Sequence, residues 1–354
     1  MSSPTSVHVL GTWVHNLKPE IIEITDTFAL RWYGLAYLAG FIVGYFGLKW
    51  LARKGLWVVQ PEKVADFVAY AAIFGVFLGG RLGYVLLYMI PENGVGYVWD
   101  HPLVILQVWK GGMSSHGGIV GLTIFTYFYA RRAGCSWTGV GDGLVIVSTL
   151  GIFFGRIANF INGELYGRVT SAAVGMKFPK ELLESEDDFY NAMREAVEAD
   201  PERLAALWDG YLASPSTGKG QLLEGALDAS RENPAILEVL GNYVQTRHPS
   251  QLYQAFLEGL TLFAILFVLR LRFRNLGHGV ITGAFFVLYA TFRIVAEQFR
   301  EPDSAWVIEG FLTKGQFYSI FMYAIGAAFV VAGLKGKTGS LEGQSSGKSV
   351  SPGS

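Results

Sequence analysis

The chain has 354 residues and a formal net charge of −1, and its composition is 51% hydrophobic but only 16% charged. Soluble domains carry about 25% charged residues, so the composition excludes an ordinary soluble domain. The near-neutral charge excludes a nucleic-acid-binding protein, and the single cysteine, Cys135, excludes an internal disulfide.

Apolar stretches long enough to cross a bilayer, about 20 residues as a helix, recur along the chain. The first begins near Thr27 and is long enough to span, so we expect no cleaved signal peptide. The fold class that this pattern predicts is an all-α polytopic integral membrane protein with about seven transmembrane helices. These helices are expected near residues 29–50, 66–89, 113–130, 141–162, 251–270, 279–299 and 316–334.

The loops between these helices alternate in positive charge. Basic residues follow the first, third, fifth and seventh helices, whereas the other loops are poorer in lysine and arginine near the membrane. The positive-inside rule then predicts an extracytoplasmic N-terminus and a cytoplasmic C-terminus.

The domain organisation follows from the same pattern. We expect an N-terminal extracytoplasmic segment over 1–28, transmembrane helices 1–4 over 29–164 and helices 5–7 over 249–335. The insert at 165–248 has an acidic middle and reads as amphipathic helices, which predicts a small extracytoplasmic head domain or arm. The Gly/Ser-rich residues 336–354 are expected to be a disordered cytoplasmic tail.

Polar side chains within the predicted spans gather at one depth. A charge inside the bilayer costs at least about 2.5 kcal/mol, yet every such residue falls in the outer half of its span. This coincidence predicts one polar cavity near the outer leaflet, lined by six helices. The residues concerned are Tyr33, Arg81, His116, Arg156, Asn159, Asn162, Glu164, Arg247, His248, Gln251, Glu258, Tyr289, Arg293, Glu297 and Arg300.

Helical spacing places several of these groups on common faces. Tyr289, Arg293, Glu297 and Arg300 fall within an arc of about 80° on the sixth helix. Arginine offers a planar fork of donors that matches phosphate oxygens, and a phospholipid headgroup is the phosphate available at that depth. Histidine is the side chain whose unperturbed pKa lies nearest neutrality, so His116 is a candidate base.

Each of these residues also has a purely structural interpretation, which the sequence leaves open. Arg81 can pair with Glu258 or Glu297, and Arg293 can form a salt bridge with Glu297 one turn away. The remaining alternatives are a hydrogen-bonded helix-end histidine at His116, interhelical hydrogen bonds from Asn159 and Asn162, and interfacial tyrosines at Tyr33 and Tyr289.

Five stretches of the chain resemble one known family. They are "RWYGLAYLAGF" from Arg31, "SSHGGIVG" from Ser114, "GRIANFINGELYGR" from Gly155, "RHPSQLYQ" from Arg247 and "YATFRIVAEQFREPD" from Tyr289. Together they resemble the bacterial prolipoprotein diacylglyceryl transferases, in the same order and over nearly the whole membrane portion.

The resemblance implies a reaction and its partners. An enzyme of this family moves a diacylglyceryl group from phosphatidylglycerol to the lipobox cysteine thiol of a preprolipoprotein and releases glycerol 1-phosphate. This is the first step of lipoprotein maturation, in the bacterial cytoplasmic membrane. No metal or organic cofactor is implied.

The resemblance also implies site residues. His116, Arg156 and Arg293 match the family's catalytic positions. The stretch "GRIANFINGELYGR" resembles the signature sequence of the family, and Asn159, Glu164 and Gly167 match positions within it. Tyr33, Tyr289 and Glu297 match further positions. His116, Arg156 and Arg293 are thus the expected catalytic residues. Depth in the membrane adds Arg81 and Asn162 to the second set, so the expected substrate-binding residues are Tyr33, Arg81, Asn159, Asn162, Glu164, Gly167, Tyr289 and Glu297. The acidic middle of the 165–248 insert departs from the family motifs.

Two other classes of function are compatible with a cluster of buried arginines. A transporter or flippase for an anionic lipid is disfavoured because the polar groups lie away from the midplane and no inverted repeat is visible. A structural membrane scaffold predicts that the arginines matter only for folding.

Overall fold

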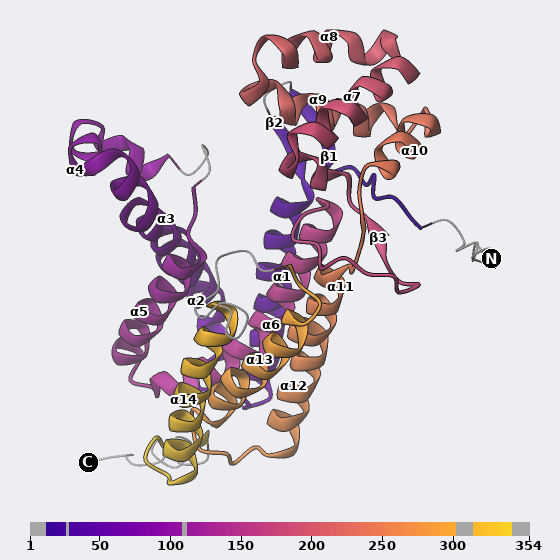
Figure 1. The fold of residues 1–354 in the computed structure, drawn as a ribbon. Helices are drawn as coiled ribbons and strands as arrows, with labels where there is room; N and C mark the ends of the chain where they lie inside the picture. Colours follow the sequence, from indigo (N-terminus) through magenta and orange to yellow (C-terminus); the bar gives the residue numbers. More distant parts are fainter. Residues whose placement is uncertain (1–11, 26–27, 108–111, 302–313, 342–354) are drawn as a thin grey trace, which may run out of the picture. The chain divides into compact units, whose positions relative to one another are not determined.

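The computed structural model describes residues 12–25, 28–107, 112–301 and 314–341 of the chain. It divides into two compact units. Unit 1 comprises residues 1–37, 152–258 and 291–318, and unit 2 comprises residues 38–151, 259–290 and 319–354. Most of the described chain is helical (Figure 1).

Among the described residues, six helical stretches are long and apolar enough to cross a membrane, which confirms a polytopic membrane protein. A further helix, α5 (Ser115–Ala133), has 19 residues but is not among these six. His116 and the pair Arg131 and Arg132 make its ends polar. The six stretches are α1 (Trp32–Arg53), the run Pro61–Asp100, α6 (Trp137–Ile161), the run Ser250–Arg272, α13 (Val280–Glu297) and Phe317–Leu334 within α14 (Lys314–Leu334).

The run Pro61–Asp100 is not a uniform α-helix. Two stretches have π-helical hydrogen bonding, a geometry that is often found at functional sites. Arg81 lies between them. The segments are η1 (Pro61–Lys63), α2 (Val64–Tyr70), η2 (Ala71–Phe77), α3 (Leu78–Tyr84), η3 (Val85–Met89) and α4 (Ile90–Asp100), followed by the short η4 (Pro102–Leu106).

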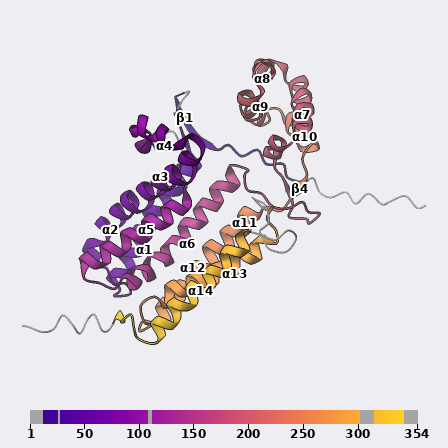
Figure 2. The same ribbon diagram turned by 60° about the vertical axis from the view of Figure 1, so that its left-hand side comes forward.

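Helices α3 and α5 lie side by side in both views (Figures 1 and 2) and touch through glycines. A Cβ atom added to Gly83 would lie 2.5 Å from the Cα of Gly117, and one added to Gly121 would lie 2.7 Å from the Cα of Gly79. The backbones therefore approach more closely than any side chain would allow, as in other membrane helix pairs.

The N-terminal part differs from the predicted all-α pattern. Strands β1 (Glu20–Thr25) and β2 (Phe28–Arg31) form an antiparallel pair, and α1 begins only at Trp32. The prediction of a helix from residue 29 was therefore wrong by three residues. A second two-stranded sheet pairs β3 (Met176–Lys177) with β4 (Thr246–Arg247).

The insert folds into short helices with their own apolar core. Buried side chains from each of them meet, including Phe189, Met193, Leu204, Leu222 and Ile236. Side chains of Ser185, Asp200 and Asn233 cap three of the helices. The elements are η6 (Pro179–Glu184), α7 (Glu186–Ala199), α8 (Pro201–Ala213), α9 (Pro215–Ala229) and α10 (Pro234–Asn242). We call residues 179–242 the helical arm.

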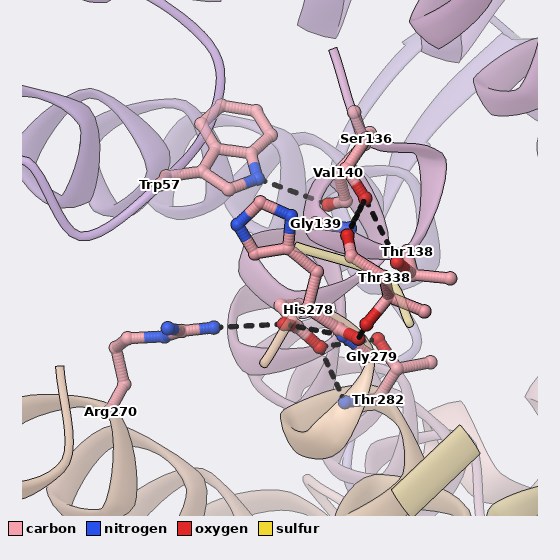
Figure 3. Close-up of polar contacts among 11 residues, drawn as sticks. Trp57, Ser136, Thr138, Gly139, Val140, Arg270, His278, Gly279, Thr282 and Thr338 are labelled. Atoms are coloured by element: carbon pink, nitrogen blue, oxygen red, sulfur yellow. Dashed lines mark hydrogen bonds and ion pairs between the residues drawn. The ribbon is translucent and has the colours of Figure 1, made fainter. Parts of the chain in front are cut away.

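Within unit 2, one buried carboxylate links three membrane helices near their ends. Its partners Arg270, Gly279 and Thr282 are labelled in Figure 3. Asp142 of α6 accepts hydrogen bonds from the backbone N–H groups of Gly279 and Thr282 and from the Thr282 hydroxyl, at 2.8–2.9 Å. It also pairs with Arg270 at 3.0 Å. Arg270 belongs to the run Ser250–Arg272, which consists of α11 (Ser250–Gln254), the π-helical η7 (Ala255–Thr261) and α12 (Leu262–Arg272).

The chain beyond α14 returns to the same place. The backbone N–H of His278 donates to the carbonyl of Gly339 at 2.9 Å, and the Thr338 hydroxyl donates to the carbonyl of His278 at 2.6 Å. The predicted disordered tail, 336–354, therefore begins with hydrogen-bonded residues, whereas 342–354 lie outside the described residues.

Candidate functional site

A buried carboxylate lies between two membrane arginines in unit 1. Glu258 has no exposed surface, and its Oε2 lies 3.7 Å from Nη2 of Arg156 while its Oε1 lies 3.9 Å from Nη1 of Arg293. Arg156 comes from α6, Arg293 from α13 and Glu258 from η7. These three residues form what we call the arginine–glutamate cluster.

The cluster has unused hydrogen-bonding capacity. At these separations neither oxygen of Glu258 makes a hydrogen bond, and Nη1 of Arg293 is also without one. The side chains of Arg156 and Arg293 are 20% and 18% exposed. Two guanidinium groups thus converge with donors free to take an anionic ligand.

The cluster is extended by a second polar group built on the signature sequence. Tyr33 donates its hydroxyl proton to Glu164 at 2.6 Å, and the Asn159 amide donates to the same carboxylate oxygen at 2.9 Å. Asn159 also contacts the Tyr33 hydroxyl and accepts from Arg156 at 3.5 Å. Asn159 therefore links Arg156 to Tyr33 and Glu164.

The signature turn after α6 requires unusual backbone geometry. Gly163 has a φ of 64° and Leu165 a φ of 57°, in the left-handed region. His15 supports this turn by donating from Nε2 to the carbonyl of Phe160 at 2.7 Å. Burial lowers the pKa of His15 to about 4, so the ring is neutral near pH 7.

Gly167 marks a point where three segments of backbone cross. Its N–H donates to the carbonyl of His248 at 2.8 Å, and a Cβ atom at this position would lie 2.2 Å from the carbonyl oxygen of Phe299. Arg247 spans the crossing, with ion pairs to Glu181 at 2.7 Å and Glu301 at 3.0 Å. Gly167 is therefore part of the frame that positions the signature rather than a group that offers chemistry.

Two further predicted residues lie in unit 1. Glu297 is buried and lies 3.5 Å from Arg293, so the salt bridge that spacing suggested is present. Arg293 nevertheless also faces Glu258, so its pairing with Glu297 is not its only interaction. The side-chain oxygen of Asn162 is buried without a hydrogen-bond partner.

Three predicted residues lie in unit 2. His116 is the second residue of α5 and its side chain is exposed; Tyr289 stacks on Phe285 in α13. Arg81 is buried and donates to the backbone carbonyls of Val104, Ile105 and Gly112 at 2.6–3.1 Å. These bonds hold Val104, Ile105 and Gly112 ahead of α5 and give Arg81 a structural role through backbone carbonyls, whereas the structural alternative considered from the sequence was a pair with Glu258 or Glu297.

Gln251 and Glu258 were predicted from their depth, but Gln254, which lies on the same polar face at the start of the run Ser250–Arg272, was not. Gln251, Gln254 and Glu258 are all fully buried and recur at helical spacing. That spacing was a signal available in the sequence. No group of three or more potential metal ligands occurs in the part of the chain that the structure describes.

Comparison with known proteins decides the family. The profile of the family described as prolipoprotein diacylglyceryl transferase matches residues 19–332. The chain belongs to this family. Its similarity to curated phosphatidylglycerol–prolipoprotein diacylglyceryl transferases extends over the full length.

The relative from Bdellovibrio bacteriovorus is 34% identical over 95% of this chain and 98% of its own. Those from Allorhizobium ampelinum and a Marinomonas species are 38% and 35% identical, over 84% and 90% of this chain and 84% and 94% of their own. As a prolipoprotein diacylglyceryl transferase, the protein is a membrane enzyme of lipoprotein biosynthesis.

Proposed function

We propose that the arginine–glutamate cluster holds the phosphate of phosphatidylglycerol while the diacylglyceryl group passes to a lipobox cysteine of a preprolipoprotein. The observation that carries this proposal is the convergence of Arg156 and Arg293 on one buried carboxylate, with guanidinium donors unused. The activity is that of the family to which the chain belongs.

The reaction exchanges one bond for another at a glyceryl carbon. The cysteine sulfur attacks as the thiolate, because the thiolate is the nucleophile, and a C–S bond forms. The C–O bond to the phosphate breaks, and glycerol 1-phosphate leaves with the electron pair. Negative charge grows on the leaving phosphate, where arginines fixed in a low-dielectric site stabilise it most.

The remaining residues have supporting roles in this proposal. His116 is the candidate general base that takes the thiol proton, an assignment that rests on the resemblance of "SSHGGIVG" to the family. Tyr33, Asn159 and Glu164 orient Arg156, and Glu297 orients Arg293. Arg81 maintains the segment ahead of His116, whereas Asn162 and Tyr289 remain predicted substrate contacts.

Replacing Arg293 tests the proposal directly. Purified protein is incubated with phosphatidylglycerol and a lipobox peptide, and the peptide mass is measured over time. The wild type is expected to add one diacylglyceryl group to a Cys peptide and none to the matched Cys→Ser peptide. Arg293→Gln is expected to lower the rate by about 10²–10³, the usual effect of removing a preplaced donor.

Arg203→Gln is the matched control, since Arg203 is an exposed arginine of α8 in the helical arm. It is expected to react at the wild-type rate. A folded wild type that binds phosphatidylglycerol but never adds mass to the peptide would contradict the transferase assignment and favour lipid transport. Equal activity of wild type and Arg293→Gln would refute the role of the cluster.

A further inference from the structure

Gln254 is a fully buried amide that makes no hydrogen bond to any residue that the structure describes. Its side chain has no exposed surface, and neither Oε1 nor Nε2 has a partner. The neighbouring Gln251 differs, because its Nε2 donates to the carbonyl of Glu164 at 2.7 Å and thereby anchors the signature turn. Gln254 has no such structural bond.

A buried amide without partners costs free energy that an apolar side chain of similar size would avoid. Buried polar groups in folded proteins are almost always paired, so an unpaired amide requires an explanation. An amide that contributes nothing to the fold is best explained by a ligand that completes its hydrogen bonds.

The position of Gln254 indicates which part of a ligand it meets. It lies four residues before Glu258 in the same helical run, about 6 Å away along the helix axis. The run begins at Ser250, so Gln254 is nearer than Glu258 to the end of the membrane helix. A group joined to the phosphate and directed toward the membrane surface would therefore meet Gln254.

We infer that Gln254 is a subsite for the hydroxyl groups of the lipid headgroup and that it sets selectivity for a glycerol headgroup. This inference rests on the proposed binding of the phosphate by the arginine–glutamate cluster. An amide both donates and accepts, as a hydroxyl does. An ammonium headgroup only donates, and would leave the amide N–H groups of Gln254 unpaired.

The test compares two lipids that differ only in these hydroxyls. Phosphatidylglycerol and phosphatidylpropanol share the phosphate and acyl chains, but the propanol headgroup has no hydroxyl. The kcat/KM for peptide modification is measured with each lipid, for the wild type and for Gln254→Leu. We expect the wild type to prefer phosphatidylglycerol about 10–100-fold, because unpaired polar groups in a site reject an analogue that lacks their partner.

Gln254→Leu is expected to reduce this preference to about twofold by lowering kcat/KM for phosphatidylglycerol while leaving phosphatidylpropanol nearly unchanged. Its thermal midpoint is expected to equal or exceed that of the wild type, because the substitution removes an unpaired buried amide. The matched control is Gln221→Leu at an exposed position of α9, which should keep both rates.

Other results would overturn the inference. An equal loss with both lipids, or a lower thermal midpoint, would make Gln254 a structural residue. Unchanged selectivity in Gln254→Leu would show that it does not read the headgroup. A wild type that modifies the peptide with neither lipid would instead refute the proposed function, and that outcome is distinct from the others.

Discussion

Gly167 occupies a place in the candidate functional site where the backbone leaves no room for a side chain. A methyl group there would lie 2.2 Å from the Phe299 carbonyl oxygen and 2.7 Å from that of His248. Both obstacles are backbone atoms, which cannot rotate away as a side chain does. The crossing of the three segments would have to open, and with it the signature turn that holds Asn159 and Glu164.

We therefore expect Gly167→Ala to lower both the thermal midpoint and the transfer rate. The thermal effect is expected to correspond to about 1–3 kcal/mol, the usual cost of overpacking a tight site. Gly151→Ala in α6 is the control, since a Cβ atom there meets nothing within 4 Å. If Gly167→Ala were as stable and active as Gly151→Ala, the crossing would not constrain the site.

The sequence predicts the positions of some residues of the site but not of others. Arg156, Asn159, Arg293 and Glu297 follow from helical spacing within single helices. The bridging position of Glu258 does not, because it depends on the packing of three helices, and Glu258 lies 102 residues after Arg156 and 35 residues before Arg293. Helical spacing places Gln254 on the same face as Gln251 and Glu258. Whether its amide makes a hydrogen bond, however, depends on the residues packed around it, which only the structure shows.

The length of the apolar stretches in the sequence predicted the membrane helices, but it did not predict where their α-helical hydrogen bonding is interrupted. The π-helical stretches η2, η3 and η7 leave no composition signal, since they differ from α-helix only in hydrogen-bond register. The hairpin of β1 and β2 was missed because its apolar residues read as the start of the first membrane helix. Tertiary pairing decided the state of that segment.

The start of α13 depends on one acid from another helix. Asp142 satisfies the N–H groups of Gly279 and Thr282 and neutralises Arg270, which is only 1% exposed. Removing one partner of a buried pair costs about 3–5 kcal/mol. We expect Asp142→Ala to lower the thermal midpoint strongly, as measured by thermal unfolding in detergent.

The double variant Asp142→Ala with Arg270→Met is the informative comparison. It removes the uncompensated charge along with the acid, so it should recover part of the lost stability. A double variant less stable than Asp142→Ala would show that Arg270 does not depend on Asp142 for neutralisation.

At the scale of the whole molecule, two buried histidines couple folding to pH. Burial lowers the pKa of His15 to about 4, and burial with the nearby charge of Arg270 does the same for His278. Their unfolded values are about 6.5. Between these values the unfolded chain binds more protons, so stability falls as pH decreases from about 6.5 to 4.

The thermal midpoint is therefore expected to be level above pH 7 and to decline below about pH 6.5. The slope is at most about 1.4 kcal/mol per pH unit for each histidine. Thermal unfolding between pH 4 and 8 measures it, and the variants His15→Asn and His278→Gln should each flatten the profile. A wild-type thermal midpoint that increases as the pH is lowered would contradict the presence of neutral buried histidines.

The charges around the arginine–glutamate cluster balance one another. Arg156, Arg293 and Arg300 are matched by Glu164, Glu258 and Glu297, so the formal sum is zero. A balanced site exerts little long-range attraction on anions in water. A soluble phosphate gains only local hydrogen bonds, whereas a lipid also retains the apolar environment of its chains. In the proposed function, the cluster therefore favours the phosphate of a lipid over the soluble phosphates of the aqueous phase.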